Sequence, residues 1–225
     1  MSGADSASSG AVIGSDVALG YEPPPGRGEE SIWIPAGGYR RIGGLNETRK
    51  ASLLSQILEL RALQGTRLVV LGNEVGELGS DERAVLRARF AFLPAAGGLL
   101  SSLNAWENIT LPLGFHDPGG LPGATARVYR LLEELGADPH ELLPKLPERM
   151  SLREKKLTGY VRILIEKPDL VLVDDLGGGL DPEEQAVAAR FPRVYQANRP
   201  GGTFVQLEGA AEARDRAGGR SPELS

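Results

Sequence analysis

The pattern of hydrophobic and polar residues divides the chain into short apolar runs and amphipathic segments. Short runs rich in β-branched and aromatic residues are typical of strands, whereas apolar residues three or four positions apart are typical of helices. The runs predict strands at residues 17–21, 31–34, 39–42, 66–71, 90–93, 170–173 and 203–207. The helical spacing predicts helices at residues 81–87, 125–135, 155–165 and 182–190, and another whose apolar positions begin at Leu53. Strands that alternate with helices in this way favour a mainly parallel α/β sheet.

The most apolar of these runs, residues 170–173, leads directly into Asp174 and Asp175 and then into a glycine turn. A buried parallel strand delivers polar side chains to a site at its carboxyl end in this manner. In sheets that handle phosphates, the first acid holds Mg²⁺ and the next polarises water. A core strand followed by a solvated turn is the alternative interpretation of these residues alone.

A glycine-containing loop at residues 43–52 leads into the helix that contains Leu53. Strand, glycine loop and helix form the context of a phosphate-binding loop, and Gly44 and Lys50 match its pattern. Arg49 replaces the second glycine and Ala51 replaces the hydroxyl residue that ligates Mg²⁺. A Glu47 carboxylate within about 4 Å of a phosphate charge would be repelled by roughly 4 kcal/mol. A plain helix N-terminus is therefore the competing interpretation.

Composition narrows the classes of protein that the chain can represent. The 225 residues include no cysteine and carry a formal charge of −5, so thiolate metal sites are excluded and nucleic acid is not an expected partner. Only His116 and His140 offer imidazole. No apolar run is long enough for a membrane helix, and the first 14 residues lack the features of a secretory signal. These observations predict a soluble, cytoplasmic protein with a disordered start at 1–14.

The segment from Leu99 to Leu113, which contains Trp106-Glu107-Asn108-Ile109, resembles the region before the helical subdomain of ATP-binding cassette (ABC) transporter ATPases. It is most similar to the cassettes of phospholipid-trafficking, organic-solvent-tolerance transporters. The resemblance implies a P-loop NTPase-like, mostly parallel sheet with a small N-terminal antiparallel subdomain and a helical insertion. We expect one cassette domain at residues 15–212, a helical subdomain at about 103–160 and a flexible tail at 213–225.

The resemblance also assigns roles to individual residues. It makes Tyr21 the aromatic that stacks on adenine, Asp174 the Mg²⁺-associated acid and Asp175 the replacement for a catalytic glutamate. It places Ser151 in the signature and Asp181 in the loop that crosses between subunits; alone, Asp181 also fits a helix N-cap. The residues that would bind nucleotide around the loop are Gly44, Asn46, Thr48, Arg49, Lys50, Ala51 and Ser52.

Several chemical groups of the family are altered while the apolar framework is intact. Ala95 stands where the family has glutamine, Gly209 stands where it has histidine, and Leu152 and Arg153 replace the signature glycines. We therefore expect a degenerate subunit that does not hydrolyse ATP and that regulates or scaffolds a lipid-type transporter. ATP and Mg²⁺ are the cofactors that the resemblance implies, with weakened binding.

The resemblance implies partners as well as cofactors. The expected partners are a permease and a second, competent ATPase subunit, and they would hold the chain peripherally at the inner membrane. Two other functions stay open. One is a slow ATPase that uses Lys50, Asp174 and Asp175, and the other is a stand-alone interaction module of cassette fold.

Overall fold

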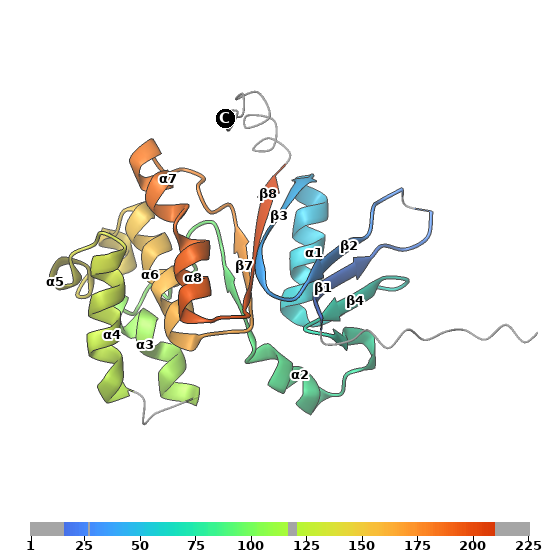
Figure 1. Ribbon diagram of the computed structural model, residues 1–225, viewed down its shortest axis with the longest axis horizontal. Coiled ribbons are helices and arrows are strands. Elements are labelled where there is room, and N and C mark those ends of the chain that lie inside the picture. The colour runs from blue at the N-terminus through green and yellow to red at the C-terminus, as the bar shows by residue number, and fades with distance from the viewer. Residues whose placement is uncertain (1–15, 27, 117–120, 210–225) are drawn as a thin grey trace, which may run out of the picture.

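The computed structural model describes residues 16–26, 28–116 and 121–209. The predicted disordered start at 1–14 and the predicted tail at 213–225 lie outside these residues. Two sheets and the helices around them make up the described part of the chain, with the helices α3 to α8 at the left of Figure 1 and the antiparallel sheet at the right.

The N-terminal sheet is antiparallel and has the order β2-β1-β4-β5. Its strands are β1 (Val17–Glu22), β2 (Ile32–Pro35), β4 (Arg67–Val70) and β5 (Asn73–Glu74). Prolines at 23–25 end β1, because they cannot donate to a ladder. Tyr21 pairs with Ile32 on one side and with Leu68 on the other. The predicted antiparallel subdomain is therefore present.

The second sheet is parallel throughout and has the order β3-β8-β7-β6. Its strands are β3 (Gly38–Leu45), β8 (Thr203–Gly209), β7 (Leu170–Asp174) and β6 (Phe90–Leu93). β7 lies inside the sheet, and Leu170 to Val173 are fully buried. A strand covered on both faces needs a continuous apolar run, which explains the sequence pattern there. The predicted α/β class with a mostly parallel sheet is confirmed.

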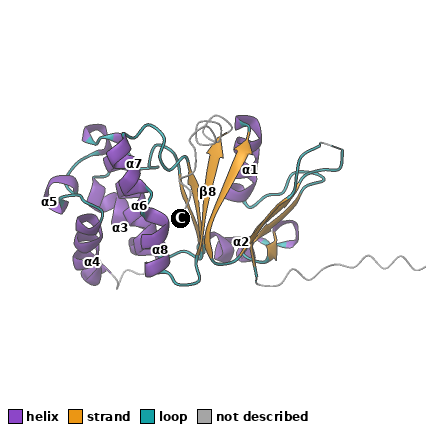
Figure 2. Cartoon of the chain, turned by 45° about the horizontal axis from the view of Figure 1, so that its top comes forward, coloured by secondary structure: helices purple, strands orange, loops and turns teal. Residues whose placement is uncertain are grey.

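Helices cover both faces of the parallel sheet. They are α1 (Glu47–Glu59), α2 (Ser80–Arg87), α3 (Ala105–His116), α4 (Leu121–Glu134), α5 (Pro139–Leu142), α6 (Leu152–Glu166), α7 (Pro182–Ala188) and α8 (Phe191–Asn198). Figure 2 shows the strands between α6 and α8 on one side and α1 on the other. Val171 and Val173 belong to the core on the α6 side, while Leu170 and Leu172 belong to the core shared with α1.

The segment that carries the family resemblance has a structural explanation. Asn108 is fully buried, and its amide binds backbone groups of Leu100, Leu103 and Asn104. It therefore fixes the turn that leads into α3. Asp169, just before β7, is likewise held by Arg89 and Arg199, with 2.8 Å between Arg89 Nε and Asp169 Oδ2.

Several elements differ from the sequence predictions, among them α3 and α5, which were not predicted as separate helices. α1 begins at Glu47, so most of the loop expected at 43–52 is helical. The helix predicted at 182–190 ends at Ala188, and α8 follows with Pro192 in its first turn, where proline is tolerated. The two-residue strand β5 was not predicted because it is too short to show a period. No helix among the described residues is long and apolar enough to cross a membrane.

Candidate functional site

The carboxyl end of β7 and the first turn of α1 bring Lys50 and Asp174 together. Lys50 Nζ lies 3.0 Å from Asp174 Oδ1 and 3.3 Å from Glu47 Oε2. Lys50 is 8% exposed. Burial by itself lowers the Lys50 pKa, but the Asp174 and Glu47 carboxylates outweigh it and raise the pKa above its usual value. Lys50 is thus a buried cation whose charge is already balanced by carboxylates of its own chain.

The connection between β3 and α1 is too short to form a phosphate-cradling loop. β3 continues to Leu45, which pairs with Gly209, and Gly44 provides the positive φ of +75° that the irregular strand end requires. Asn46 then caps the helix, with 2.8 Å between its Oδ1 and the Arg49 amide, and its carbonyl accepts from the Lys50 amide. The Arg49 and Lys50 amides are therefore bonded within the start of α1.

The other residues of this predicted nucleotide-binding group are partly engaged elsewhere. Arg49 Nε lies 3.5 Å from Glu29 Oε2, and its guanidinium also donates to the Glu30 carbonyl. Thr48 and Ala51 are exposed on the helix. Ser52 is half-buried, and its hydroxyl accepts weakly from the Gln56 amide at 3.4 Å. The first turn of α1 therefore carries two cations that already have internal partners.

The turn after β7 is held by a lysine that sequence reasoning did not identify. Lys156 is 3% exposed, and its Nζ donates to the carbonyls of Asp175 at 2.8 Å and Gly178 at 2.7 Å. Asp175 has a left-handed φ of +47°, and its carboxylate occupies the space beside Gly178 that a Cβ would need. A polar residue at a buried position of α6 is the only signal for Lys156 in the sequence.

Ser151 and Asp181 both serve as helix N-caps. Ser151 Oγ accepts from the Glu154 amide at 3.2 Å, and the Glu154 carboxylate accepts from the Ser151 amide at 2.8 Å. Asp181 and Glu184 form the same reciprocal pair at the start of α7. The N-cap interpretation of Asp181 is confirmed, and both side chains stabilise a helix start without any ligand.

Comparisons with known proteins identify the architecture. No protein-family model matches the chain. Solved structures that resemble it include cbiO1 from Clostridium perfringens, part of the ABC transporter complex cbiONQ, with a TM-score of 0.67, 17% identity and coverage of 86% of this chain and 79% of that chain. The ATP-binding cassette MJ0796 bound to ADP and Pi gives a TM-score of 0.62 at 20% identity, with 85% of each chain covered. The chain has the ABC ATPase fold.

Sequence relatives of this cassette are named as methionine import ATP-binding proteins. MetN of Xanthomonas campestris pv. campestris is 31% identical over 168 residues, which is 74% of this chain and 48% of that protein. MetN 2 of Pseudomonas aeruginosa is 30% identical over 166 residues, again 74% of this chain and 48% of that protein. The cassette therefore spans about half the length of the curated relatives that it matches.

The structure does not support the prediction that Tyr21 of the cassette stacks on adenine. Tyr21 is only 4% exposed and belongs to the core between the antiparallel sheet and α1. A stacking platform needs an accessible ring face, which Tyr21 lacks in this arrangement. The residue next to it, Gly20, is covered by the ring of Trp33, which is 40% exposed and contacts the Arg67 guanidinium.

The residues present do not form a Mg²⁺ site on their own. The described part of the chain contains no group of three or more acidic or histidine side chains that could hold a metal. Asp174 Oδ1 is buried without a well-directed hydrogen bond, but it faces the Lys50 ammonium as an ion pair. Ala51 supplies no hydroxyl ligand. Lys50 already neutralises Asp174, and no such group of ligands includes that carboxylate among the described residues, so the donor set does not fit the metal.

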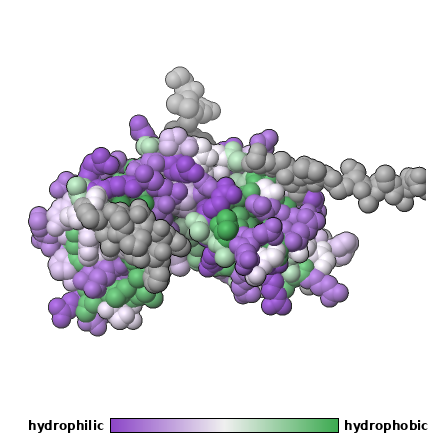
Figure 3. Space-filling model, turned by 90° about the horizontal axis from the view of Figure 1, so that it is seen from below, coloured by the Kyte–Doolittle hydropathy of each residue, from purple (hydrophilic) through white to green (hydrophobic). Residues whose placement is uncertain are grey.

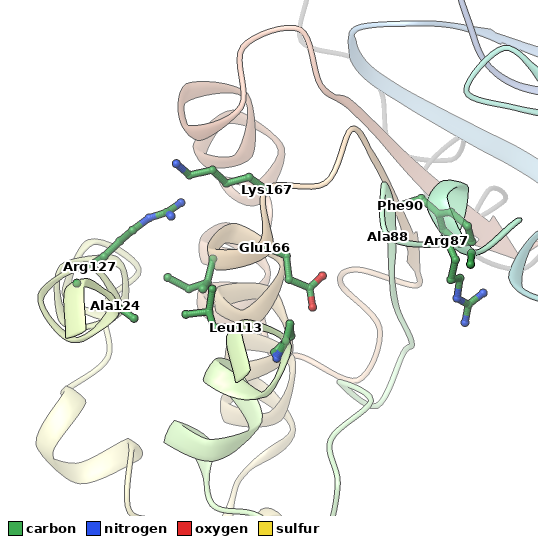
Figure 4. A pocket seen from close by; sticks show the side chains of 12 residues that line it. Arg87, Ala88, Phe90, Leu113, Ala124, Arg127, Glu166 and Lys167 are labelled. Atoms are coloured by element: carbon green, nitrogen blue, oxygen red, sulfur yellow. The ribbon is translucent and has the colours of Figure 1, made fainter. Parts of the chain in front are cut away.

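A pocket of about 690 Å³ lies at the opposite end of the parallel strands, between α2, α3, α4 and the end of α6. Arg127 and Lys167 lie on one side of it and Arg87 lies on the other, with Glu166 between them (Figure 4). Seen from below, the part of the surface that is coloured by hydropathy carries hydrophobic residues in separate groups among hydrophilic ones (Figure 3). This pocket is distinct from the Lys50 site.

Proposed function

We propose that this chain is the ATP-binding cassette subunit of a membrane transporter and that it regulates or scaffolds the complex without hydrolysing ATP. The ABC ATPase fold and the similarity to transporter ATP-binding proteins support the first part of the proposal. Since the chain spans about half of those relatives, its activity has to be argued from its own residues.

The observation that carries the second part is the internal neutralisation of Lys50. In phosphoryl transfer a lysine of this kind stabilises charge on the phosphates, and an acid nearby holds Mg²⁺. Here Asp174 and Glu47 bind the lysine instead, and the amides of Arg49 and Lys50 are bonded to Asn46. The carboxylate contacts of the ammonium must give way before it can stabilise charge on a triphosphate.

The Asp175 carboxylate also differs from a group that positions water. It is one carbon shorter than the glutamate of the family, and it packs against the Gly178 turn that Lys156 holds. A displacement of about 1 Å can lower a reaction rate by roughly a hundredfold. This geometry supports a cassette that is inactive or very slow.

The similarity to transporter ATP-binding proteins suggests the partners of this chain, and a separate observation suggests the class of substrate. We propose a permease and a second, competent ATPase subunit as partners that hold the chain at the inner membrane. The segment from Trp106 to Leu113 supports a lipid-type transporter, whereas the named relatives import methionine. Copurification with a permease and analysis of the bound substrate distinguish lipid from amino-acid transport.

We propose that such a partner docks at the pocket between α2 and α4, away from Lys50. Its three basic residues against Glu166 favour an acidic segment. Lys167→Glu should weaken capture of the permease from detergent-solubilised membranes, while Arg61→Glu, on an exposed loop, should leave it unchanged. Equal capture of the permease by both variants would show that the permease does not dock at this pocket.

The direct test of the proposal is ATP hydrolysis by the purified chain with Mg²⁺. We expect phosphate release no faster than that of Lys50→Met, which removes the ammonium and keeps an unbranched side chain of similar length at this position. Turnover well below about 1 s⁻¹, the lower end of ordinary enzyme rates, that Lys50→Met abolishes would support the slow-ATPase alternative. Turnover at or above that rate would show a competent ATPase, and either result would refute the regulatory proposal.

A further inference from the structure

We propose that Glu47 is an internal competitor for the Lys50 ammonium and thereby keeps polyphosphate anions away from the first turn of α1. This inference rests on the proposed function, because it concerns the same site. It goes further in that it attributes the low anion affinity expected of this site to one replaceable side chain.

The geometry places Glu47 on the solvent side of the lysine. The Glu47 side chain is 77% exposed, compared with 10% for Lys50 and 20% for Asp174. Asp174 is fixed at the end of β7, whereas Glu47 is the first residue of a helix and can move. An anion arriving from solvent would therefore replace Glu47, not Asp174, as the second partner of the ammonium.

The local charge is unfavourable to an anion because carboxylates outnumber cations. Lys50 and Arg49 provide two positive charges, and they are paired with the carboxylates of Glu47, Asp174 and Glu29. Two cations against three carboxylates leave a net charge of −1. Neutralising Glu47 alone brings this sum to zero and leaves Lys50 with a single carboxylate partner.

The helix itself would remain intact without the Glu47 charge. Asn46 caps α1 through its own side chain, and this bond doesn't involve the Glu47 carboxylate. An exposed ion pair between residues three apart contributes little to stability. Glu47 can therefore be changed as a probe of anion binding with the fold preserved.

The test is a titration of inorganic pyrophosphate into the wild-type chain and into Glu47→Gln, which keeps the shape and removes the charge. We expect Glu47→Gln to bind about tenfold more tightly, the effect of about 1.4 kcal/mol. Raising the salt concentration should reduce the gain, because exposed charges are screened. Adding Lys50→Met to Glu47→Gln should abolish it.

Glu59→Gln is the matched control, because Glu59 lies in the last turn of the same helix and accepts from the Ser55 hydroxyl. An equal gain in Glu59→Gln would attribute the effect to net charge and overturn the inference. Unchanged affinity in both Glu47→Gln and Glu47→Ser, with helix content preserved by circular dichroism, would overturn it as well. ATP turnover by the wild type would instead refute the proposed function, so the two failures are distinguishable.

Discussion

Lys156→Met tests whether the buried lysine under the turn after β7 stabilises the fold. Methionine keeps an unbranched chain of similar length and removes the ammonium, so the packing of α6 is preserved while two short hydrogen bonds are lost. A hydrogen bond to a charged group contributes about 1.5–3 kcal/mol, so the gross loss is roughly 3–6 kcal/mol.

An opposing effect reduces this loss. The wild type bears the cost of removing an ammonium from water, which is several kcal/mol for a buried ion, and methionine does not. The carbonyls of Asp175 and Gly178, which lose their donor in the variant, are already counted in the gross loss. We therefore expect a net destabilisation of about 2–3 kcal/mol.

The assay is urea unfolding followed by the fluorescence of Trp33 and Trp106. Lys155→Met, at the half-buried neighbouring position, should change the free energy of unfolding by less than about 0.5 kcal/mol. A Lys156→Met variant as stable as the wild type would refute the reasoning, because it would mean that the cost of burying the ammonium cancels its hydrogen bonds.

Three further predictions concern the scaffold of the site. Gly97→Ala should destabilise the fold by about 3 kcal/mol or more, because Gly97 has a φ of +87° and an added Cβ would clash with the Lys155 carbonyl. A urea midpoint like that of the wild type would contradict this. Asp181→Ala should cost about 1 kcal/mol through loss of the α7 cap, and an unchanged thermal midpoint would contradict it. Burial opposes the ionised form of Asp169, but its two arginines outweigh it and lower the Asp169 pKa. Its contribution to stability is thus present above the unfolded pKa of about 3.9 and is lost as the pH falls through the lower folded value. The free energy of unfolding of Asp169→Asn should therefore fall less steeply with decreasing pH in this range, and the same pH dependence in variant and wild type would contradict the assignment.

The strands were predictable because their apolar runs reflect burial directly. Leu170 to Val173 are buried on both faces, so the run is continuous and its place inside a parallel sheet follows. The start of α1 was missed because Gly44 and Lys50 matched a loop pattern. The signal that overrode it was Asn46 followed by Glu47, an N-cap residue with an acid in the first turn.

The site was only partly predictable, because the sequence does not specify which side chains meet. Lys50 and Asp174 were both named, but the third member of their contact, Glu47, was expected to repel phosphate and not to bind the lysine. The burial of Tyr21 depends on how the antiparallel sheet packs on α1, which a strand pattern does not reveal. Lys156 depends on a contact between α6 and a turn some 20 residues later.

The proposed function depends on the pairing of the cations at the start of α1 with carboxylates of the same chain. Calorimetric titration of the purified wild-type chain with Mg-ATP, beside Lys50→Met, measures this most directly. We expect a dissociation constant above about 1 mM, which corresponds to a binding free energy weaker than about −4 kcal/mol, and no difference between the two proteins. Micromolar binding by the wild type that Lys50→Met abolishes would contradict this expectation.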